Sequence, residues 1–301
     1  MTVLLRDVTL RDGLQDEAPV PTAAKVALFE ALVAAGIRDL ELTSFVRPDR
    51  VPAMADAEEL VAATAGHGSV TRWGLVLNER GARRALAAGL RHLQAVISVS
   101  EAHQRENAGQ SVDEGLEGLR ATVELAATEG AVVELTLATA FGCPYAGSVP
   151  VADVVRVAQA AVDAGVSALG LADTIGTAVP TEVGPLVSAV AALGVPVGVH
   201  LHDTRGLAIA NALEAIRAGV TRIDGSVGGL GGCPFAPGAS GNLPLEDLVH
   251  ALEAMAIDTA VDVPALVDAA RLACGLVGRE VASHVGVAGP RFASTPHATQ
   301  W

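Results

Sequence analysis

The chain has 301 residues, 50% of them hydrophobic, and carries a formal net charge of −14 with an isoelectric point near 4.9. This acidity argues against a nucleic-acid partner or a membrane surface, since both favour a basic face. The three cysteines, Cys143, Cys233 and Cys274, are far apart and odd in number, which favours a reduced, cytoplasmic protein over a disulfide framework.

Short runs typical of β-strands alternate with longer segments of helical period along the chain. Strands are predicted at 3–10, 39–43, 72–76, 93–99, 132–137, 168–171, 195–201 and 222–227. Helices are predicted after them at 22–35, 54–65, 79–89, 111–128, 151–164, 180–193, 206–218 and 244–256. Eight strand–helix pairs in about 250 residues predict an α/β fold, the (β/α)8 TIM barrel.

We expect one domain over residues 1–301, because no linker divides the chain, with residues 257–301 adding a helix and a tail. The longest apolar stretches are interrupted by Gly, Asp or Pro before they could cross a bilayer. A doubly wound sheet is the structural alternative. It usually carries a G-x-G-x-x-G fingerprint after its first strand, where this chain has RDGLQDE, residues 11–17.

Two charged residues, Arg11 and Asp12, follow the first predicted strand, and a buried charge needs a partner. Adjacent strand residues point to opposite sides, so these two are expected to pair poorly with each other. Glu41 has the inward parity of the second strand and is expected to hold Arg11. Arg11 would then present a fixed positive charge to a substrate oxygen, with Gln15 as a further hydrogen-bonding candidate.

Period-two alternation in VPVGVHLHD, residues 195–203, places His200 and His202 on one face of the seventh strand. In a barrel the aliphatic face meets the helices, so both histidines point into the mouth. A lone histidine is more often structural, but two imidazoles at i, i+2 on a rigid strand are typical of a metal pair. The first strand closes the barrel against the eighth, which brings Asp12 toward them as a third ligand.

The glycine-rich segment 228–242 follows the eighth strand and is either a mobile lid or a connection that needs unusual backbone angles. Cys233 lies in it, and a lone cysteine is often inert. Asn242 ends it, and can equally be the cap of the next helix. The sequence does not decide whether Asp173, which ends the sixth strand, orients a substrate or caps a helix. Cys143 has no visible base beside it and is expected to line the site.

Six motifs follow one another along the chain: RDGLQDE (11–17), ELTSFVRPDRVPAM (41–54), GCPYAG (142–147), ADTIG (172–176), HLHDTRGLAIAN (200–211) and GGCPFAPGASGN (231–242). In this order they resemble 3-hydroxy-3-methylglutaryl-CoA lyase. The wider group is the metal-dependent barrel lyases and Claisen-type synthases.

The resemblance implies a divalent metal, Mg²⁺ or Mn²⁺, held by Asp12, His200, His202 and Asn242; Zn²⁺ and Co²⁺ match these ligands less well. It also implies an acyl-CoA substrate, and we expect a homodimer or a larger homo-oligomer. The implied substrate-binding positions are Arg11, Gln15, Ser44, Arg105, Asn107 and Asp173, and the implied catalytic positions are Arg11, Asp12, Glu41, His200 and Cys233.

The implied reaction cleaves the C2–C3 bond of a 3-hydroxyacyl thioester, giving acetyl-CoA and acetoacetate or another 3-oxo acid. The metal acidifies the tertiary hydroxyl, and Asp12 or His200 takes its proton. Arg11 stabilises the enolate oxygen and Cys233 protonates the enolate carbon. Glu106, beside Arg105, lies in a region where the family has lysines that bind the CoA phosphates. The sequence therefore does not decide which acyl-CoA is the substrate.

The sequence leaves three alternatives to a lyase. A Claisen-type synthase generally carries a C-terminal regulatory domain, for which the 45 residues after the eighth predicted helix are too few. A 2-oxo-acid aldolase of the same barrel group would not be expected to carry the CPFAPGASGN loop. A non-catalytic barrel that keeps the metal as structure has no need of Arg11, Glu41 and Cys233.

Overall fold

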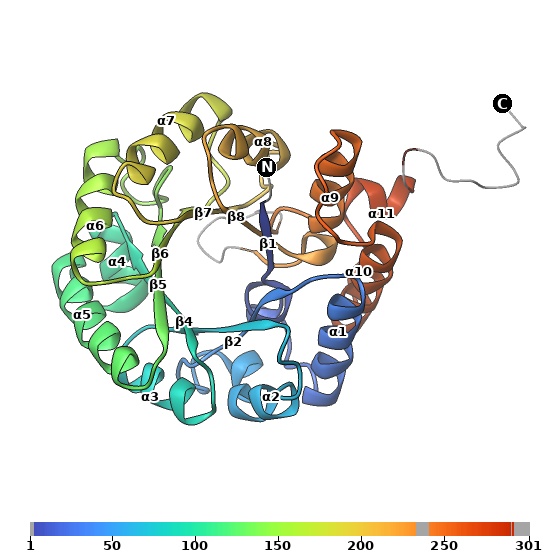
Figure 1. Ribbon diagram of the computed structural model, residues 1–301, viewed down its shortest axis with the longest axis horizontal. Helices are drawn as coiled ribbons and strands as arrows, with labels where there is room; N and C mark the ends of the chain where they lie inside the picture. Colours follow the sequence, from blue (N-terminus) through green and yellow to red (C-terminus); the bar gives the residue numbers. More distant parts are fainter. Residues whose placement is uncertain (1–2, 233–240, 290, 292–301) are drawn as a thin grey trace, which may run out of the picture.

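Eight parallel strands pair in sequence order and close into a barrel in the computed structural model, which describes residues 3–232, 241–289 and 291 (Figure 1). The ring closes where Arg6 pairs in register with Asp224 of the last strand. The predicted (β/α)8 fold is therefore confirmed. The strands are β1 (Leu4–Asp7), β2 (Asp39–Ser44), β3 (Thr71–Val76), β4 (His92–Ser98), β5 (Val132–Ala138), β6 (Ala168–Asp173), β7 (Val197–Leu201) and β8 (Arg222–Gly225).

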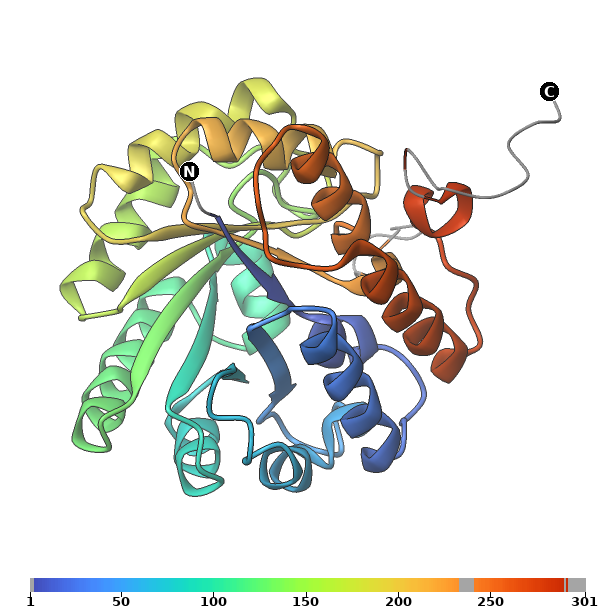
Figure 2. The same ribbon diagram turned by 45° about the vertical axis from the view of Figure 1, so that its right-hand side comes forward.

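Helices surround the strands on the outside (Figures 1 and 2). They are α1 (Thr22–Ala34), α2 (Ala57–Ala63), α3 (Glu79–Ala87), α4 (Glu101–Ala108), α5 (Val112–Thr128), α6 (Val151–Asp163), α7 (Pro180–Ala191), α8 (Ala208–Arg217), α9 (Leu245–Ala254), α10 (Val263–Val277) and α11 (His284–Ala288). The sequence pattern does not predict α4, which is short and mostly polar, and it predicts one helix where α10 and α11 lie. In the described part of the chain, no helix is long and apolar enough to cross a membrane.

Local sequence explains where several helices begin and end. Ser111 and Glu114 form a reciprocal capping box at the start of α5, with bonds of 3.1 and 2.7 Å between each side chain and the other residue's amide. Asp262 accepts a hydrogen bond from the amide of Ala265 at the start of α10, and Gly278 ends that helix with φ of 68°. The long helix α10 packs beside α1 (Figure 2).

The first strand is shorter than predicted, because the chain leaves the sheet after Asp7 and forms a π-helical turn over Thr9–Gly13. The Asp7 carboxylate accepts hydrogen bonds from the amide of Thr9 at 3.0 Å and from its hydroxyl at 2.7 Å. The amide of Gly13 donates to the carbonyl of Val8 at 3.1 Å and closes the turn. Arg11 and Asp12 therefore lie on a turn, where side chains do not alternate as in a strand, and the prediction that they point to opposite sides is wrong.

Aliphatic side chains fill the layer between strands and helices, whereas the interior of the barrel is charged. Arg6 pairs with Asp39 and Glu134, and Arg222 pairs with Glu134 at 2.5 Å. Gly198 makes room for this layer, since a Cβ there would lie 2.8 Å from the guanidinium carbon of Arg222. The sequence pattern does not predict this ion-paired interior.

Candidate active site

Two histidines and one aspartate converge at the C-terminal end of the barrel. The imidazole Nε2 atoms of His200 and His202 lie 3.2 Å apart, and they lie 3.8 and 3.6 Å from Oδ2 of Asp12. One ligand atom from each of the three residues falls within 4.8 Å of the others. The structure thus brings together the three ligands predicted from distant parts of the sequence.

The contact of Nδ1 sets the orientation of each imidazole ring. Nδ1 of His202 lies 2.9 Å from the carbonyl oxygen of Thr174, to which it donates, so Nε2 carries the free lone pair. Nδ1 of His200 lies 3.7 Å from Oδ2 of Asp224 on β8. A carbonyl or carboxylate behind the imidazole is the usual support for a metal-binding histidine. Both Nε2 atoms consequently face Asp12.

Asn242 completes the group from the other end of the glycine-rich segment. Its Nδ2 donates to Oδ2 of Asp12 at 2.7 Å and to the carbonyl of Leu230 at 2.9 Å. Its Oδ1 is buried and has no hydrogen-bond partner among the described residues. A buried carbonyl oxygen without a donor is costly, and a cation would satisfy it. This orphaned oxygen fits the predicted ligand role of Asn242.

The electrostatic field keeps the carboxylate charged. Burial raises the pKa of Asp12, but the Arg11 guanidinium and the two histidines outweigh it and hold this pKa well below its usual value. Burial lowers the pKa of His200, but the neighbouring carboxylates Asp224 and Asp12 outweigh it and raise this pKa above its usual value. Asp12 is therefore available as an ionised ligand at neutral pH.

Arg11 contacts two carboxylates. Its Nη2 lies 2.8 Å from Oε2 of Glu41, as the sequence analysis expected. Its Nη1 also pairs with Oδ1 of Asp12, which contradicts the expectation that these neighbours pair poorly. The reason is the π-helical turn, which lets both side chains point into the barrel mouth. Glu41 and Asp12 together fix the position of the guanidinium.

The donor set fits a divalent cation. In the part of the chain that the structure describes, Arg11 pairs with two carboxylates, and Arg6 and Arg222 pair with three others. His200 lies between the two groups, near Asp12 and Asp224. Each group therefore has one more carboxylate than guanidinium, and a cation beside Asp12 would offset this excess, since buried charges need compensation. The arginines are Arg6, Arg11 and Arg222, and the carboxylates are Asp12, Asp39, Glu41, Glu134 and Asp224.

A large cavity of about 1040 Å³ opens above this group. Arg11, Asp12, His200 and His202 lie at its inner end, and Gln15 and Asn107 line it as expected of substrate-binding residues. Four arginines after the second and third strands line the outer part: Arg47, Arg50, Arg80 and Arg84. These arginines were not among the predicted site residues, although RPDR (47–50) and ERGARR (79–84) each begin within three residues of a strand end.

Several predicted residues lie elsewhere. Asp173 accepts hydrogen bonds from the amides of Thr177 and Ala178 at 2.8 and 3.0 Å, so it caps a turn and does not line the cavity. Ser44 is fully buried outside the cavity lining. Arg105 pairs with Glu101 at 3.6 Å on the surface of α4. Cys143 is buried against Ser100 and does not line the cavity, contrary to expectation.

The expected catalytic Cys233 lies outside the described residues. Gly232, which precedes it, lines the cavity. The chain returns close by, since the amide of Asn242 donates to the carbonyl of Leu230 at 3.4 Å. A Cβ on Gly231 would lie 2.4 Å from Nδ2 of Asn242 and 3.4 Å from Oδ2 of Asp12. Glycine is thus required where the two ends of this segment meet beside the histidines.

The fold and the site define a (β/α)8-barrel enzyme with a candidate divalent-metal site at the C-terminal ends of its strands. A family model described as HMGL-like matches residues 2–273. The hydroxymethylglutaryl-CoA lyase YngG of Bacillus subtilis is 40% identical, over 89% of this chain and 91% of its own length. The (R)-citramalyl-CoA lyase of Chloroflexus aurantiacus is 38% identical, over 96% of each chain.

A solved structure agrees with these matches. An HMG-CoA lyase from Acinetobacter baumannii, in complex with coenzyme A and 3-methylmalate, superposes with a TM-score of 0.93 at 36% identity and covers 98% of this chain and 97% of that one. The chain belongs to the HMGL-like family and is a carbon–carbon lyase of the HMG-CoA lyase type.

Proposed function

We propose that the protein cleaves 3-hydroxy-3-methylglutaryl-CoA, or a close 3-hydroxyacyl-CoA, to acetyl-CoA and acetoacetate or another 3-oxo acid. The observation that carries the proposal is the convergence of Asp12, His200 and His202 beside Arg11 at the inner end of the cavity. Citramalyl-CoA is the second candidate substrate, because a (R)-citramalyl-CoA lyase matches nearly the whole chain.

The metal ligands and the base act on the C3 hydroxyl group of the substrate. Asp12, His200, His202 and Asn242 would hold Mg²⁺ or Mn²⁺, which supplies Lewis acidity toward the tertiary hydroxyl. Asp12 or His200 takes the hydroxyl proton as the C2–C3 bond breaks. The bonding electrons pass to the thioester, forming an enolate, while the C3–O bond becomes a carbonyl.

Arg11 and Cys233 act on the departing enolate. The Arg11 guanidinium, held by Glu41, faces the developing negative charge on the enolate oxygen. Cys233 then donates a proton to the enolate carbon, which completes acetyl-CoA. Its neighbour Gly232 lines the cavity, which supports this assignment.

The arginines of the outer cavity support a CoA ester as the substrate. Arg50 and Arg80 form no salt bridge with the described residues, whereas Arg47 pairs with Asp49 and Arg84 with Glu58. Free guanidinium groups at the rim of an otherwise acidic protein suit the phosphates of CoA. We assign the phosphate contacts to Arg50 and Arg80 in preference to Arg105, and we keep Asn107 as a contact.

Acetyl-CoA release tests the proposal. Purified protein with Mg²⁺ or Mn²⁺ is given 3-hydroxy-3-methylglutaryl-CoA and, separately, (R)-citramalyl-CoA, and the release must stop on adding EDTA. Appearance of free thiol from acetyl-CoA and a 2-oxo acid would favour the synthase instead. Activity with none of these would leave the non-catalytic barrel as the better explanation.

We also propose a cytoplasmic location and an oligomeric state for the enzyme. Both described cysteines, Cys143 and Cys274, are free and buried, which fits the reduced cytoplasm. We propose a homodimer or larger homo-oligomer, which sedimentation of the purified protein would test.

A further inference from the structure

The carbonyl group that orients His202 comes from a turn and not from a strand. Nδ1 of His202 donates to the carbonyl oxygen of Thr174 at 2.9 Å, and Thr174 directly follows β6. His200 has its support from Asp224 on β8, where pairing with both neighbouring strands fixes the backbone. The Thr174 carbonyl can therefore hold the imidazole only if the turn over residues 174–176 is itself held.

Thr139 holds this turn from the side of the barrel. Its amide donates to the hydroxyl oxygen of Thr174 at 2.7 Å, and its own hydroxyl oxygen accepts from the amide of Ser100 at 3.3 Å. Thr139 directly follows β5 with a φ of 58°, a left-handed conformation that is rare for a β-branched residue. Such strained residues persist where surrounding contacts require them, and they cluster at functional sites.

Arg205 holds the same turn from the outside. Its Nη1 donates to the carbonyl oxygens of Ile175 and Gly176 at 2.9 and 2.8 Å. Arg205 follows His202 by three residues and does not line the cavity. One guanidinium nitrogen thus links the segment that carries His202 to the turn that carries its acceptor.

The two segments also pack closely against each other. Gly176 has a φ of 60°, and a Cβ there would lie 2.6 Å from Cβ of Thr204, so glycine is required at this contact. The carboxylate of Asp203 accepts from the amide of Ala208 at 2.9 Å. Arg205 therefore extends from a backbone that is itself fixed.

The tautomer of His202 depends on the position of this turn. A carbonyl oxygen can only accept, so it keeps the proton on Nδ1 and leaves the lone pair on Nε2, which lies 3.6 Å from Oδ2 of Asp12. If the turn moves, either nitrogen can carry the proton, and a protonated Nε2 cannot bind a metal. Removing a group that supports a metal-binding histidine typically lowers metal affinity by about 10- to 100-fold.

We propose that Arg205 is a positioning residue of the metal site, which holds the turn over residues 174–176 so that Thr174 fixes the tautomer of His202. The inference rests on the proposed function and deepens it, because His202 is one of the metal ligands assigned there. Arg205 acts through two backbone carbonyls and contacts neither the substrate nor the metal.

The affinity for Mn²⁺ tests the role of Arg205. We expect calorimetry on purified Arg205→Ala to show Mn²⁺ binding weakened by about fivefold or more. The matched control is Arg38→Ala, because Nη1 of Arg38 likewise donates to two carbonyl oxygens, those of Val33 and Ile37, at 2.7 and 2.8 Å. Arg38 precedes β2, at the opposite end of the barrel from the histidines. Parent-like affinity in Arg205→Ala, or an equal loss in Arg38→Ala, would overturn the proposal.

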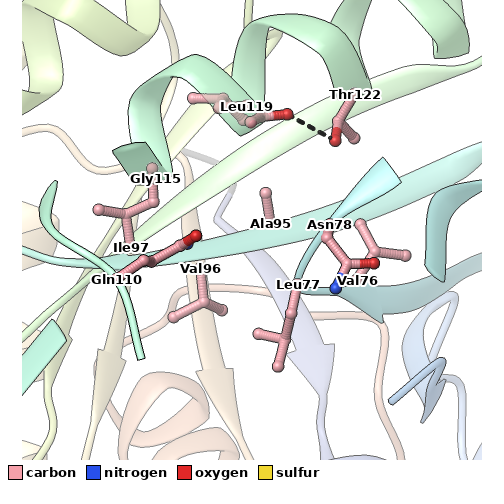
Figure 3. Close-up of a pocket in the computed structure, with 11 residues that line it drawn as sticks. Val76, Leu77, Asn78, Ala95, Val96, Ile97, Gln110, Gly115, Leu119 and Thr122 are labelled. Atoms are coloured by element: carbon pink, nitrogen blue, oxygen red, sulfur yellow. Dashed lines mark hydrogen bonds between the residues drawn. The ribbon is translucent and has the colours of Figure 1, made fainter. Parts of the chain in front are cut away.

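A second pair of variants tests the turn from its inner side. Thr174→Val removes the hydroxyl that accepts from Thr139 but keeps the carbonyl that accepts from His202, and it should weaken Mn²⁺ binding by about threefold or more. The control is Thr122→Val on α5, whose hydroxyl donates to the carbonyl of Gly118 at 2.9 Å. Figure 3 shows Thr122 in a separate small crevice between α5 and the strands β3 and β4.

The tautomer of His202 is a readout that a merely structural role would leave unchanged. In metal-free, ¹⁵N-labelled protein at a pH above the histidine titrations, NMR should show Nδ1 of His202 protonated in the parent chain and in Arg38→Ala. Arg205→Ala should show a mixture of both tautomers. The signals of His202 are assigned by their absence from the spectrum of His202→Gln. Parent-like ring-nitrogen shifts of His202 in Arg205→Ala would contradict the proposal.

Neither measurement involves turnover, so this inference and the proposed lyase function can fail separately. Weaker Mn²⁺ binding and mixed tautomers in Arg205→Ala, with no acyl-CoA cleaved by the parent chain, would support the role of Arg205 and contradict the lyase proposal. Cleavage of an acyl-CoA by the parent chain, with Mn²⁺ affinity and tautomer unchanged in Arg205→Ala, would do the reverse.

Discussion

The side-chain amide of Asn242 donates a 2.7 Å hydrogen bond to Oδ2 of Asp12, from a position 230 residues further along the chain. This bond joins the end of the glycine-rich segment to the turn after the first strand. The same Asp12 oxygen faces both histidines, so Asn242 lies beside the candidate metal ligands Asp12, His200 and His202.

Replacing Asn242 with alanine removes the orphaned Oδ1 and the bond to Asp12. We expect Asn242→Ala to bind Mn²⁺ about tenfold more weakly or worse, measured by calorimetry on purified protein. Asn107→Ala is the matched control, since Asn107 lines the same cavity away from the metal group. Unchanged Mn²⁺ affinity in Asn242→Ala would exclude it as a ligand.

Asp224 is expected to position His200. Its Oδ2 lies 3.7 Å from Nδ1 of His200, and Arg222 holds its other oxygen at 2.6 Å. Asp224→Asn should weaken Mn²⁺ binding by about 10- to 100-fold. Asp39→Asn serves as the control, because Asp39 is also a buried carboxylate paired with an arginine but does not contact His200. Equal losses in the two variants would assign Asp224 a role in stability alone.

Cys233 is the proposed proton donor. Cys233→Ala and His200→Ala should each reduce kcat by about 10² or more, since both remove an acid–base or ligand group. The thermal unfolding temperature should stay close to that of the parent chain. Cys274→Ala, at a buried cysteine outside the cavity, is expected to keep its activity. Near-normal turnover in Cys233→Ala would remove this residue from the mechanism.

If Arg50 and Arg80 at the cavity rim bind the CoA phosphates, replacing either residue should change KM much more than kcat. Arg80→Gln and Arg50→Gln should each raise KM for the CoA ester about fivefold or more at low ionic strength, with kcat within twofold. Arg105→Gln is the comparison, because Arg105 pairs with Glu101 outside the cavity lining. If only the Arg105 variant raised KM, α4 would be the phosphate site instead.

Two buried carboxyls outside the ligand group predict how stability depends on pH. Burial raises the pKa of Asp7 and of Glu246 to about 7, which hydrogen bonds from Thr9 and Gly228 oppose only in part. In the unfolded chain these pKa values are about 4, so the folded chain binds protons more tightly. Their stabilising contribution is complete below about pH 4 and is lost as the pH rises through about 7.

Replacing one of these carboxyls with an amide should make the free energy of unfolding depend less on pH. We expect the free energy of unfolding of Glu246→Gln, from urea denaturation at pH 5 to 8, to fall less steeply with pH than that of the parent chain. Glu79→Gln, on the exposed side of α3, should leave the slope unchanged. An identical slope in Glu246→Gln would show that this carboxyl does not titrate in that range.

The sequence by itself determined the barrel, the inward histidines and the pairing of Arg11 with Glu41. Strand alternation has a period of two and helical segments a period of 3.6, so both are visible over a few residues. The alternation from Val195 to His202 placed both histidines correctly, because His200 lies in β7 and His202 directly follows it in an extended bridge to Asn242. A closed ring then required Asp12 to approach them.

Only the tertiary structure decided how the ends of the strands are used. The turn over Thr9–Gly13 depends on Asp7 and on a hydrogen bond from the amide of Val227 to the Thr9 hydroxyl, across 218 residues. Asp224 behind His200, the ion-paired interior of the barrel and the rim arginines likewise come from separate strands and loops. Such contacts have no period along the chain, because they form when the ring closes and side chains from different strands share one interior.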